Sequence, residues 1–295
     1  MSNLINGHGA GWMRDLPDFR DYTLENVVAK GALTVAPGWR KPIFTASGGF
    51  AADTSPLPST VDLRQWCSPV EDQGPLGSCT AFAGIGLVEY SQRRAFGKHL
   101  DASPRFLYKA TRDLLHWQGD TGAYLRSTLK ALALLGVAPE EYWPYDIAQF
   151  DVEPPVLAYA LGQSYQALRY LRLDPAGRSP AEVLERVKVM LVAGFPSAFG
   201  FTVYESIYGV GGTGNIPFPG PGERVVSGHA VCAVGYDDHR NMNGMPGGLL
   251  VRNSWGTGWG ASGYGWLPYA YVTEGLAVDF WSVLRQEWID TGQFG

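Results

Sequence analysis

The chain has 295 residues, of which 45% are hydrophobic and 17% charged, and its formal net charge is −5. This length suffices for one large domain or for two smaller ones that share a cleft. The acidic balance provides neither a basic field for nucleic acid nor a polybasic patch for a membrane surface. We therefore expect no partner of either kind.

Cysteine content and hydropathy indicate the cellular compartment in which the protein is expected. The three cysteines, at positions 67, 79 and 232, can form at most one disulfide, which is typical of a reducing environment. The first residues lack an apolar core of signal-peptide length, and no run of about 18 apolar residues occurs in the chain. We therefore expect a cytoplasmic protein, with export by a route without a cleaved signal as the alternative.

Residues 1–57 differ from the rest of the chain. Large apolar residues such as Trp12 and Phe19 do not suit a solvated linker, and repeated prolines and glycines leave no helical or strand period. Either this stretch is an extended strap packed on a domain surface, or it is a pro-segment that crosses a cleft and restrains an enzyme. We expect the main domain at residues 58–284 and a C-terminal tail at 285–295.

A glycine-rich loop leads into a cysteine at residues 73–79. The sequence Gln-Gly-Pro-Leu-Gly-Ser precedes Cys79, and small apolar residues with helical character follow it. A thiol in the first turn of a helix lies near free backbone N–H groups and the positive end of the helix dipole, which favour the nucleophilic thiolate. Alternatively, Cys79 is a buried free cysteine that acts as a small hydrophobic residue.

The chain from Cys79 onward divides into a helical part and an extended part. Four segments have helical patterns or helix start signals, at 79–96, 103–114, 124–135 and 180–193. Five later segments have the pattern of strands, at 196–203, 229–236, 249–255, 263–267 and 278–283. This order predicts an α+β fold with a seam between the two parts, and such seams host binding sites.

Catalysis by a cysteine requires further groups at that seam. A base must take the thiol proton, a polar side chain must orient the base, and N–H donors must face the oxyanion. Of the five histidines, His229 is the one that opens a strongly apolar strand; the alternative is a strand-end histidine bonded to backbone. Asn253 follows in the sequence Arg-Asn-Ser-Trp-Gly, and the amide of Gln73 lies six residues before Cys79.

Together these motifs resemble those of the papain-like cysteine peptidases. Residues 73–82 resemble the nucleophile loop of that family, residues 228–236 its histidine strand and residues 253–264 its asparagine block. Their order and spacing agree with the family pattern. The resemblance covers residues 57–280 and implies a papain-like two-lobed fold, with a helical left lobe, an antiparallel β right lobe and the active site in the cleft between them.

The resemblance also implies a role for each residue of the site. Cys79 is the nucleophile and His229 the base, paired as thiolate and imidazolium. Asn253 orients the imidazole, and Trp255 shields that hydrogen bond and borders the substrate. Gln73 supplies an amide to the oxyanion hole.

Four further residues are implied to bind substrate. Gly122 matches the glycine that pairs with substrate backbone, and Tyr124, Gly200 and Ala230 match positions around the pocket for the second residue before the scissile bond. Ordinary turn and packing roles are the alternative for these residues. The implied activity is the hydrolysis of peptide bonds in a polypeptide substrate through an acyl-enzyme, by a monomer with no cofactor and no metal.

The chain departs from the family pattern at two positions. Leu76 stands where a disulfide cysteine is usual, and Thr80 where tryptophan is usual. These departures indicate a prokaryotic-type branch without the usual disulfides, and residues 1–57 resemble the short leader of bacterial members such as xylellain. Two other functions use the same residues: an acyl or amide transferase or deamidase, and a non-catalytic peptide-binding module that has kept the motifs.

Overall fold

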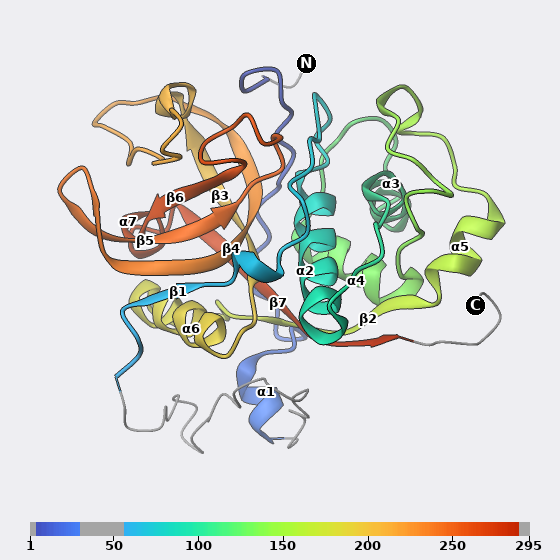
Figure 1. Ribbon diagram of the computed structural model, residues 1–295, viewed down its shortest axis with the longest axis horizontal. Helices are drawn as coiled ribbons and strands as arrows, with labels where there is room; N and C mark the ends of the chain where they lie inside the picture. The colour runs from blue at the N-terminus through green and yellow to red at the C-terminus, as the bar shows by residue number, and fades with distance from the viewer. Residues whose placement is uncertain (1–3, 30–55, 289–295) are drawn as a thin grey trace.

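The structure is a computed structural model that describes residues 4–29 and 56–288. Figure 1 shows two lobes side by side, with α2, α3, α4 and α5 in one and the strands β3, β4, β5 and β6 in the other. This arrangement confirms the predicted papain-like two-lobed α+β fold. The parts of the predicted N-terminal and C-terminal stretches at 30–55 and 289–295 lie outside the described residues.

The helical lobe is built around α2. Its helices are α2 (Cys79–Phe96), α3 (Pro104–Leu114), α4 (Leu125–Leu135) and α5 (Val156–Gly162). Helix α2 packs against α3 and α4 on one side and against β4 of the other lobe, and most of its residues are buried. Its nearly all-round burial suits the small and apolar residues that follow Cys79.

One antiparallel sheet, in the order β2-β7-β3-β4-β5-β6 with β1 paired to β4, forms the second lobe, and its edge strand β2 extends under α4 and α5 of the helical lobe (Figure 1). The strands are β1 (Thr60–Asp62), β2 (Tyr165–Arg172), β3 (Ser197–Tyr204), β4 (Val225–Met242), β5 (Met245–Arg252), β6 (Tyr264–Pro268) and β7 (Ala277–Trp288). The helices α6 (Pro180–Val192) and α7 (Tyr269–Thr273) pack on this sheet. Helix α1 (Leu24–Ala29) lies in the N-terminal part of the chain.

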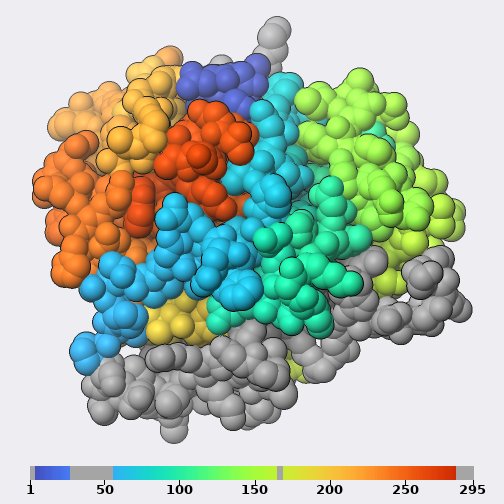
Figure 2. Space-filling view, in the orientation of Figure 1, coloured from blue at the N-terminus to red at the C-terminus, as the bar shows by residue number. Residues whose placement is uncertain are grey.

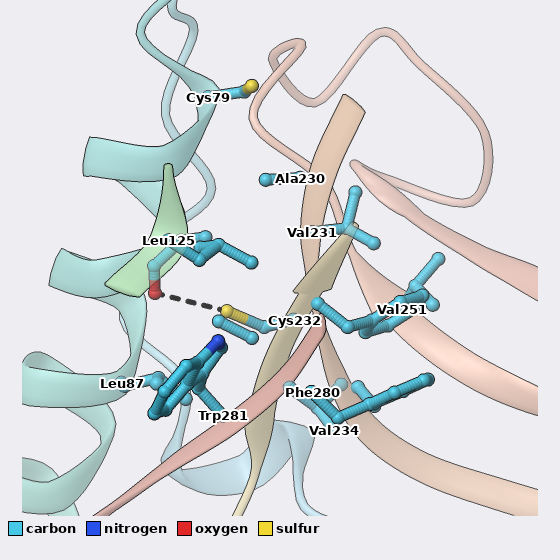
Figure 3. Close-up of a cluster of buried hydrophobic side chains, with 14 of the residues drawn as sticks. Cys79, Leu87, Leu125, Ala230, Val231, Cys232, Val234, Val251, Phe280 and Trp281 are labelled. Atoms are coloured by element: carbon cyan, nitrogen blue, oxygen red, sulfur yellow. Dashed lines mark hydrogen bonds between the residues drawn. The ribbon is translucent and has the colours of Figure 1, made fainter. Parts of the chain in front are cut away.

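Helix α2 and strand β4 meet along the seam between the lobes. The thiol of Cys232 in β4 donates a hydrogen bond to the carbonyl oxygen of Ala83 in α2, at 3.2 Å (Figure 3). In the pairing of β3 with β4, Gly200 lies opposite Ala230 and Phe201 opposite His229. The backbone amide of Ala230, the residue after His229, interacts with the Cys79 thiol, which places this end of β4 at the beginning of α2.

The observed elements agree with most of the predicted ones and add to them. Strand β4 runs from Val225 to Met242, well beyond the predicted 229–236, and β7 continues to Trp288, past residue 284. Strand β2 and helix α5 were not predicted, because the two arginines of β2 weaken its apolar pattern and α5 is only 7 residues long. Within 4–29 and 56–288, no helix combines the length and apolar character needed to cross a membrane.

Candidate active site

Cys79 is the first residue of α2 and is completely buried. Figure 3 shows its side chain pointing from the first turn of α2 toward the seam, where Ala230 lies on β4. The backbone N–H of Gly11 donates to the Cys79 sulfur at 3.4 Å. Burial raises the pKa of Cys79 above its ordinary value, although the amides of Gly11 and Ala230 oppose the shift. In this state the protonated thiol is favoured over the thiolate.

His229 is held by Asn253. The Nε2 atom of His229 lies 2.7 Å from Oδ1 of Asn253. Because an amide oxygen only accepts hydrogen bonds, Nε2 carries the proton and Nδ1 is left as the proton acceptor. Nδ1 is buried without a hydrogen-bond partner among the described residues. Burial lowers the pKa of His229 to about 4, so the imidazole is neutral in this state.

Trp255 covers the pair formed by His229 and Asn253. Its ring stacks on the imidazole, with a centroid distance of 4.4 Å and an interplanar angle of 29°. The Trp255 side chain is buried, as is Asn253. The arrangement keeps water away from the bond that fixes the imidazole.

Gln73 is oriented by the block that contains Asn253. Its Oε1 accepts a hydrogen bond from the hydroxyl of Ser254 at 2.6 Å. Its Nε2 donates to the carbonyl oxygens of Leu76 at 2.7 Å and Gly9 at 3.0 Å. The amide that the sequence predicted for an oxyanion hole is therefore in contact with an N-terminal residue.

Residues 4–29, here called the N-terminal segment, run between the lobes in Figure 1, and the beginning of the segment is visible at the top of the molecule in Figure 2. Their backbone is bonded to both sides of the seam. Ala123 donates its N–H to Gly11 at 2.9 Å and accepts the N–H of Met13 at 3.1 Å. The N–H of Trp12 donates to the carbonyl oxygen of Gly228 on β4, at 3.3 Å. The cleft is therefore occupied by the chain itself.

The side chain of Trp12 fills a pocket lined by Gly200 and Gly228. A Cβ atom added at Gly200 would lie 1.8 Å from the Trp12 ring, so only glycine leaves room for this ring. The indole N–H donates to Oδ2 of Asp279 at 3.1 Å. Trp12 is 8% exposed, and its ring closes the pocket from solvent.

The predicted substrate-binding residues lie in different surroundings. Gly200 lines the Trp12 pocket, and Ala230 is buried beside Cys79. The N–H of Gly122 is bonded to the hydroxyl of Tyr108, at 3.0 Å, and the Tyr124 ring packs against Trp117, at a centroid distance of 5.5 Å.

Two residues of the site were missed by sequence reasoning. Ala123, next to the predicted Gly122, pairs through its backbone with Gly11 and Met13 of the N-terminal segment. Asp279 lies at the far end of the Trp12 pocket, and its signal in the sequence was the one acidic residue of the predicted strand 278–283.

Comparison with known proteins gives the family to which the chain is similar. The model of the papain family cysteine protease matches residues 57–275. An uncharacterized peptidase C1-like protein of Acanthamoeba polyphaga mimivirus is 36% identical over 233 residues, which cover 77% of this chain and 73% of that protein. Cathepsin K of Gallus gallus is 30% identical over 217 residues, which cover 72% of this chain and 59% of that protein.

A solved structure is similar over nearly the whole chain. It is that of xylellain, a cysteine protease from Xylella fastidiosa, with a TM-score of 0.72 and 30% identity, and the match covers 94% of this chain and 96% of that one. The three cysteines of the present chain are free, as the departure at Leu76 implied. Because the family match spans most of the chain and includes the cysteine, histidine and asparagine gathered at the seam, this protein belongs to the papain family of cysteine proteases.

Proposed function

We propose that the protein hydrolyses peptide bonds with Cys79 as its nucleophile, and that the N-terminal segment holds it inactive until the segment leaves the cleft. One observation carries this proposal. The Cys79 sulfur and the Gln73 amide both contact the backbone of the N-terminal segment, at 3.4 Å and 3.0 Å. A substrate needs the same two groups.

In the open cleft, His229 takes the proton of the Cys79 thiol, and the thiolate attacks the carbonyl carbon of the peptide bond. The backbone N–H of Cys79 and Nε2 of Gln73 donate to the oxygen as it becomes negative. The imidazolium then protonates the leaving amine, which leaves a thioester on Cys79. Water, deprotonated by His229, releases the acid product and regenerates the thiol.

The closed state suppresses the first proton transfer. Burial raises the pKa of Cys79 and lowers that of His229 to about 4, so the neutral thiol and the neutral imidazole are both favoured. When the segment leaves, water reaches both groups and this desolvation is relieved. The thiolate and imidazolium can then form as a pair, because each stabilises the charge of the other.

The position of the segment also explains why the enzyme does not cleave it while it occupies the cleft. Nucleophilic attack requires one carbonyl group to face both the sulfur and the oxyanion donors. Here the sulfur faces the N–H of Gly11, and Gln73 binds the carbonyl oxygen of Gly9, two residues earlier. The two catalytic groups therefore contact different peptide units, and neither unit is placed for cleavage.

The test compares the full-length protein with a full-length Trp12→Ala variant on a panel of fluorogenic peptides. We expect the variant to hydrolyse them faster and to form a covalent adduct on Cys79 with a peptidyl epoxide. Adding Cys79→Ser should abolish both. An opened variant that forms no adduct contradicts the proposal, and transfer to an added amine without hydrolysis indicates an acyltransferase instead.

The division into a segment and a peptidase domain at 58–284 has its own test. Deletion of residues 1–56 should raise the rate of hydrolysis of small peptides, since it clears the cleft. A deleted protein that folds and gains no activity contradicts restraint by the segment, and a protein that no longer folds indicates a structural strap.

A further inference from the structure

Asp279 is an acidic side chain at the end of an otherwise apolar pocket. It lies in β7 and is completely buried. Its Oδ1 accepts the indole N–H of Trp281 at 2.7 Å and lies 3.3 Å from Nη2 of Arg172. Its Oδ2 accepts the indole N–H of Trp12 at 3.1 Å. One carboxylate oxygen thus belongs to the body of the protein and the other faces the occupant of the pocket.

The backbone at Asp279 is in the left-handed region, with a φ of 65°. This conformation is unfavourable for a residue with a side chain, although aspartate tolerates it better than most. The carboxylate is therefore fixed toward the pocket by an unusual backbone and by its contacts with Trp281 and Arg172. Purely apolar packing requires no such arrangement.

Departure of the N-terminal segment removes the hydrogen bond of Oδ2. Among the described residues, Trp12 is the one that donates to this oxygen. A buried acceptor that loses its donor is destabilising. A ligand that supplies a new donor to Oδ2 should therefore bind more tightly than a ligand of the same shape that has none. The pocket thus discriminates by chemistry as well as by size.

We propose that this pocket selects substrates by the side chain that enters it, here called the anchoring side chain. The preferred one is a large aromatic ring with a hydrogen-bond donor at its far end, and Asp279 accepts the hydrogen bond from that donor. Tryptophan is the natural side chain of this kind that the pocket already holds. Gly200 and Gly228 supply the width for a bicyclic ring, since a Cβ at Gly200 would overlap the indole. The proposal rests on the peptidase function proposed above.

The shape of the pocket favours indole over a cationic anchor. Arg172 is already paired with two carboxylates, those of Asp279 and Asp174, so charge alone does not select among donors. A flat bicyclic ring fills the space that Gly200 and Gly228 leave, and a lysine or arginine side chain does not. We therefore expect indole to be preferred over cationic anchors as well as over rings that lack a donor.

The test uses the full-length Trp12→Ala protein, in which the pocket is vacated and the chain is intact. Two fluorogenic peptides differ at the anchoring residue, which is tryptophan or 3-benzothienylalanine, where sulfur replaces the N–H group. We expect kcat/KM to be about tenfold higher for the tryptophan peptide. Adding Asp279→Gly, which suits the left-handed backbone and removes the acceptor, should bring the ratio to about 1.

A ratio near 1 before Asp279 is changed overturns the proposal, as does a preference for a lysine or arginine anchor. A second measurement does not depend on hydrolysis or on the folding of an Asp279 variant. Free indole and free benzothiophene are titrated into the Trp12→Ala protein, and binding is followed by thermal shift. Indole should bind about tenfold more tightly. Equal binding overturns the proposal, whereas loss of hydrolysis with a retained indole preference contradicts only the peptidase function.

Discussion

The two halves of the N-terminal segment contact the protein in different ways. Residues 8–13 use backbone hydrogen bonds, the buried ring of Trp12, and the His8 side chain, which lies 3.1 Å from Asp72 and stacks on Trp255. Residues 15–25 use carboxylates against arginines of the body: Asp15 and Asp21 bind Arg126, Asp21 also lies 3.6 Å from Arg172, and Glu25 binds Arg178 and Arg186. The first half occupies the cleft, and the second attaches to the surface beyond it.

This difference assigns closure of the cleft to one half of the segment and attachment to the body of the protein to the other. Backbone bonds and a filled pocket are short-ranged and need close fit, so residues 8–13 determine whether the cleft is closed. The ion pairs of the outer half range from partly exposed, as between Arg126 and Asp15, to buried, as between Arg172 and Asp21, and the exposed ones are individually weak and depend on salt. We infer that the outer half keeps the inner half close to the cleft and contributes less to the closing energy.

Loss of the Trp12 ring should have the largest effect. Truncation of a buried tryptophan to alanine costs about 3–5 kcal/mol, so Trp12→Ala should raise the alkylation rate of Cys79 in the full-length protein by about 100-fold or more. The rate is followed by mass spectrometry of the peptide that contains Cys79. Phe19→Ala is the matched control, because Phe19 is 96% exposed on the same segment.

The buried thiols of Cys67 and Cys232 report on folding in the same experiment. Opening of the cleft exposes Cys79 alone, whereas unfolding exposes all three. A Trp12→Ala protein in which Cys79 reacts at the rate of the unmodified chain contradicts the assignment of closure to residues 8–13.

A methyl group at Gly11 should also open the cleft, with a smaller effect. A Cβ there would lie 2.1 Å from the carbonyl oxygen of Gly77 in the nucleophile loop. The atoms that it would meet all belong to the Gly77 backbone, which cannot rotate away as a side chain can. Overpacking of this kind costs about 1–3 kcal/mol, so Gly11→Ala should accelerate Cys79 alkylation about 10- to 100-fold. Gly212→Ala is the control, because a Cβ at Gly212 meets no atom within 4 Å.

Removal of Arg126 tests the outer half. Arg126→Ala takes away the partner of Asp15 and Asp21 and should accelerate Cys79 alkylation about tenfold, which corresponds to about 1.4 kcal/mol for this cluster. Raising the salt concentration should accelerate the unmodified protein and have less effect on the variant. Arg20→Ala is the control, because Arg20 pairs with Asp18 inside the segment. An effect of Arg126→Ala as large as that of Trp12→Ala would remove the distinction between the halves.

The same contrast explains what the sequence could and could not predict. The loop before Cys79, the strand at His229 and the block at Asn253 are local patterns, and each predicted its place in the fold and at the seam. The occupation of the Trp12 pocket depends on residues far apart in the chain: Gly228, Gly200 and Asp279 come from three different strands. Nothing local in residues 8–13 fixes which part of the body they pair with, so the two interpretations of the segment stayed open.

The ion pairs of Glu25 should give the smallest effect, and its pH dependence has a definite sign. Partial burial alone would raise the pKa of Glu25, but its hydrogen bond with Arg186 contributes to holding it at about 2, below the ordinary value of 4.5. A carboxylate with a lowered pKa stabilises the folded contact above pH 4.5 and loses that contribution as the pH falls toward 2.

Glu25→Gln should therefore accelerate thiol modification of Cys79 about threefold at pH 6, the range for a partly exposed ion pair, and have no effect near pH 2. A dipyridyl disulfide, which reacts with thiols in acid, allows both rates to be measured. Acidification of the unmodified protein from pH 7 to pH 5 should leave the contribution of Glu25 unchanged. A difference between the two proteins that is already lost at pH 5 would place the attachment on other carboxylates of the outer half.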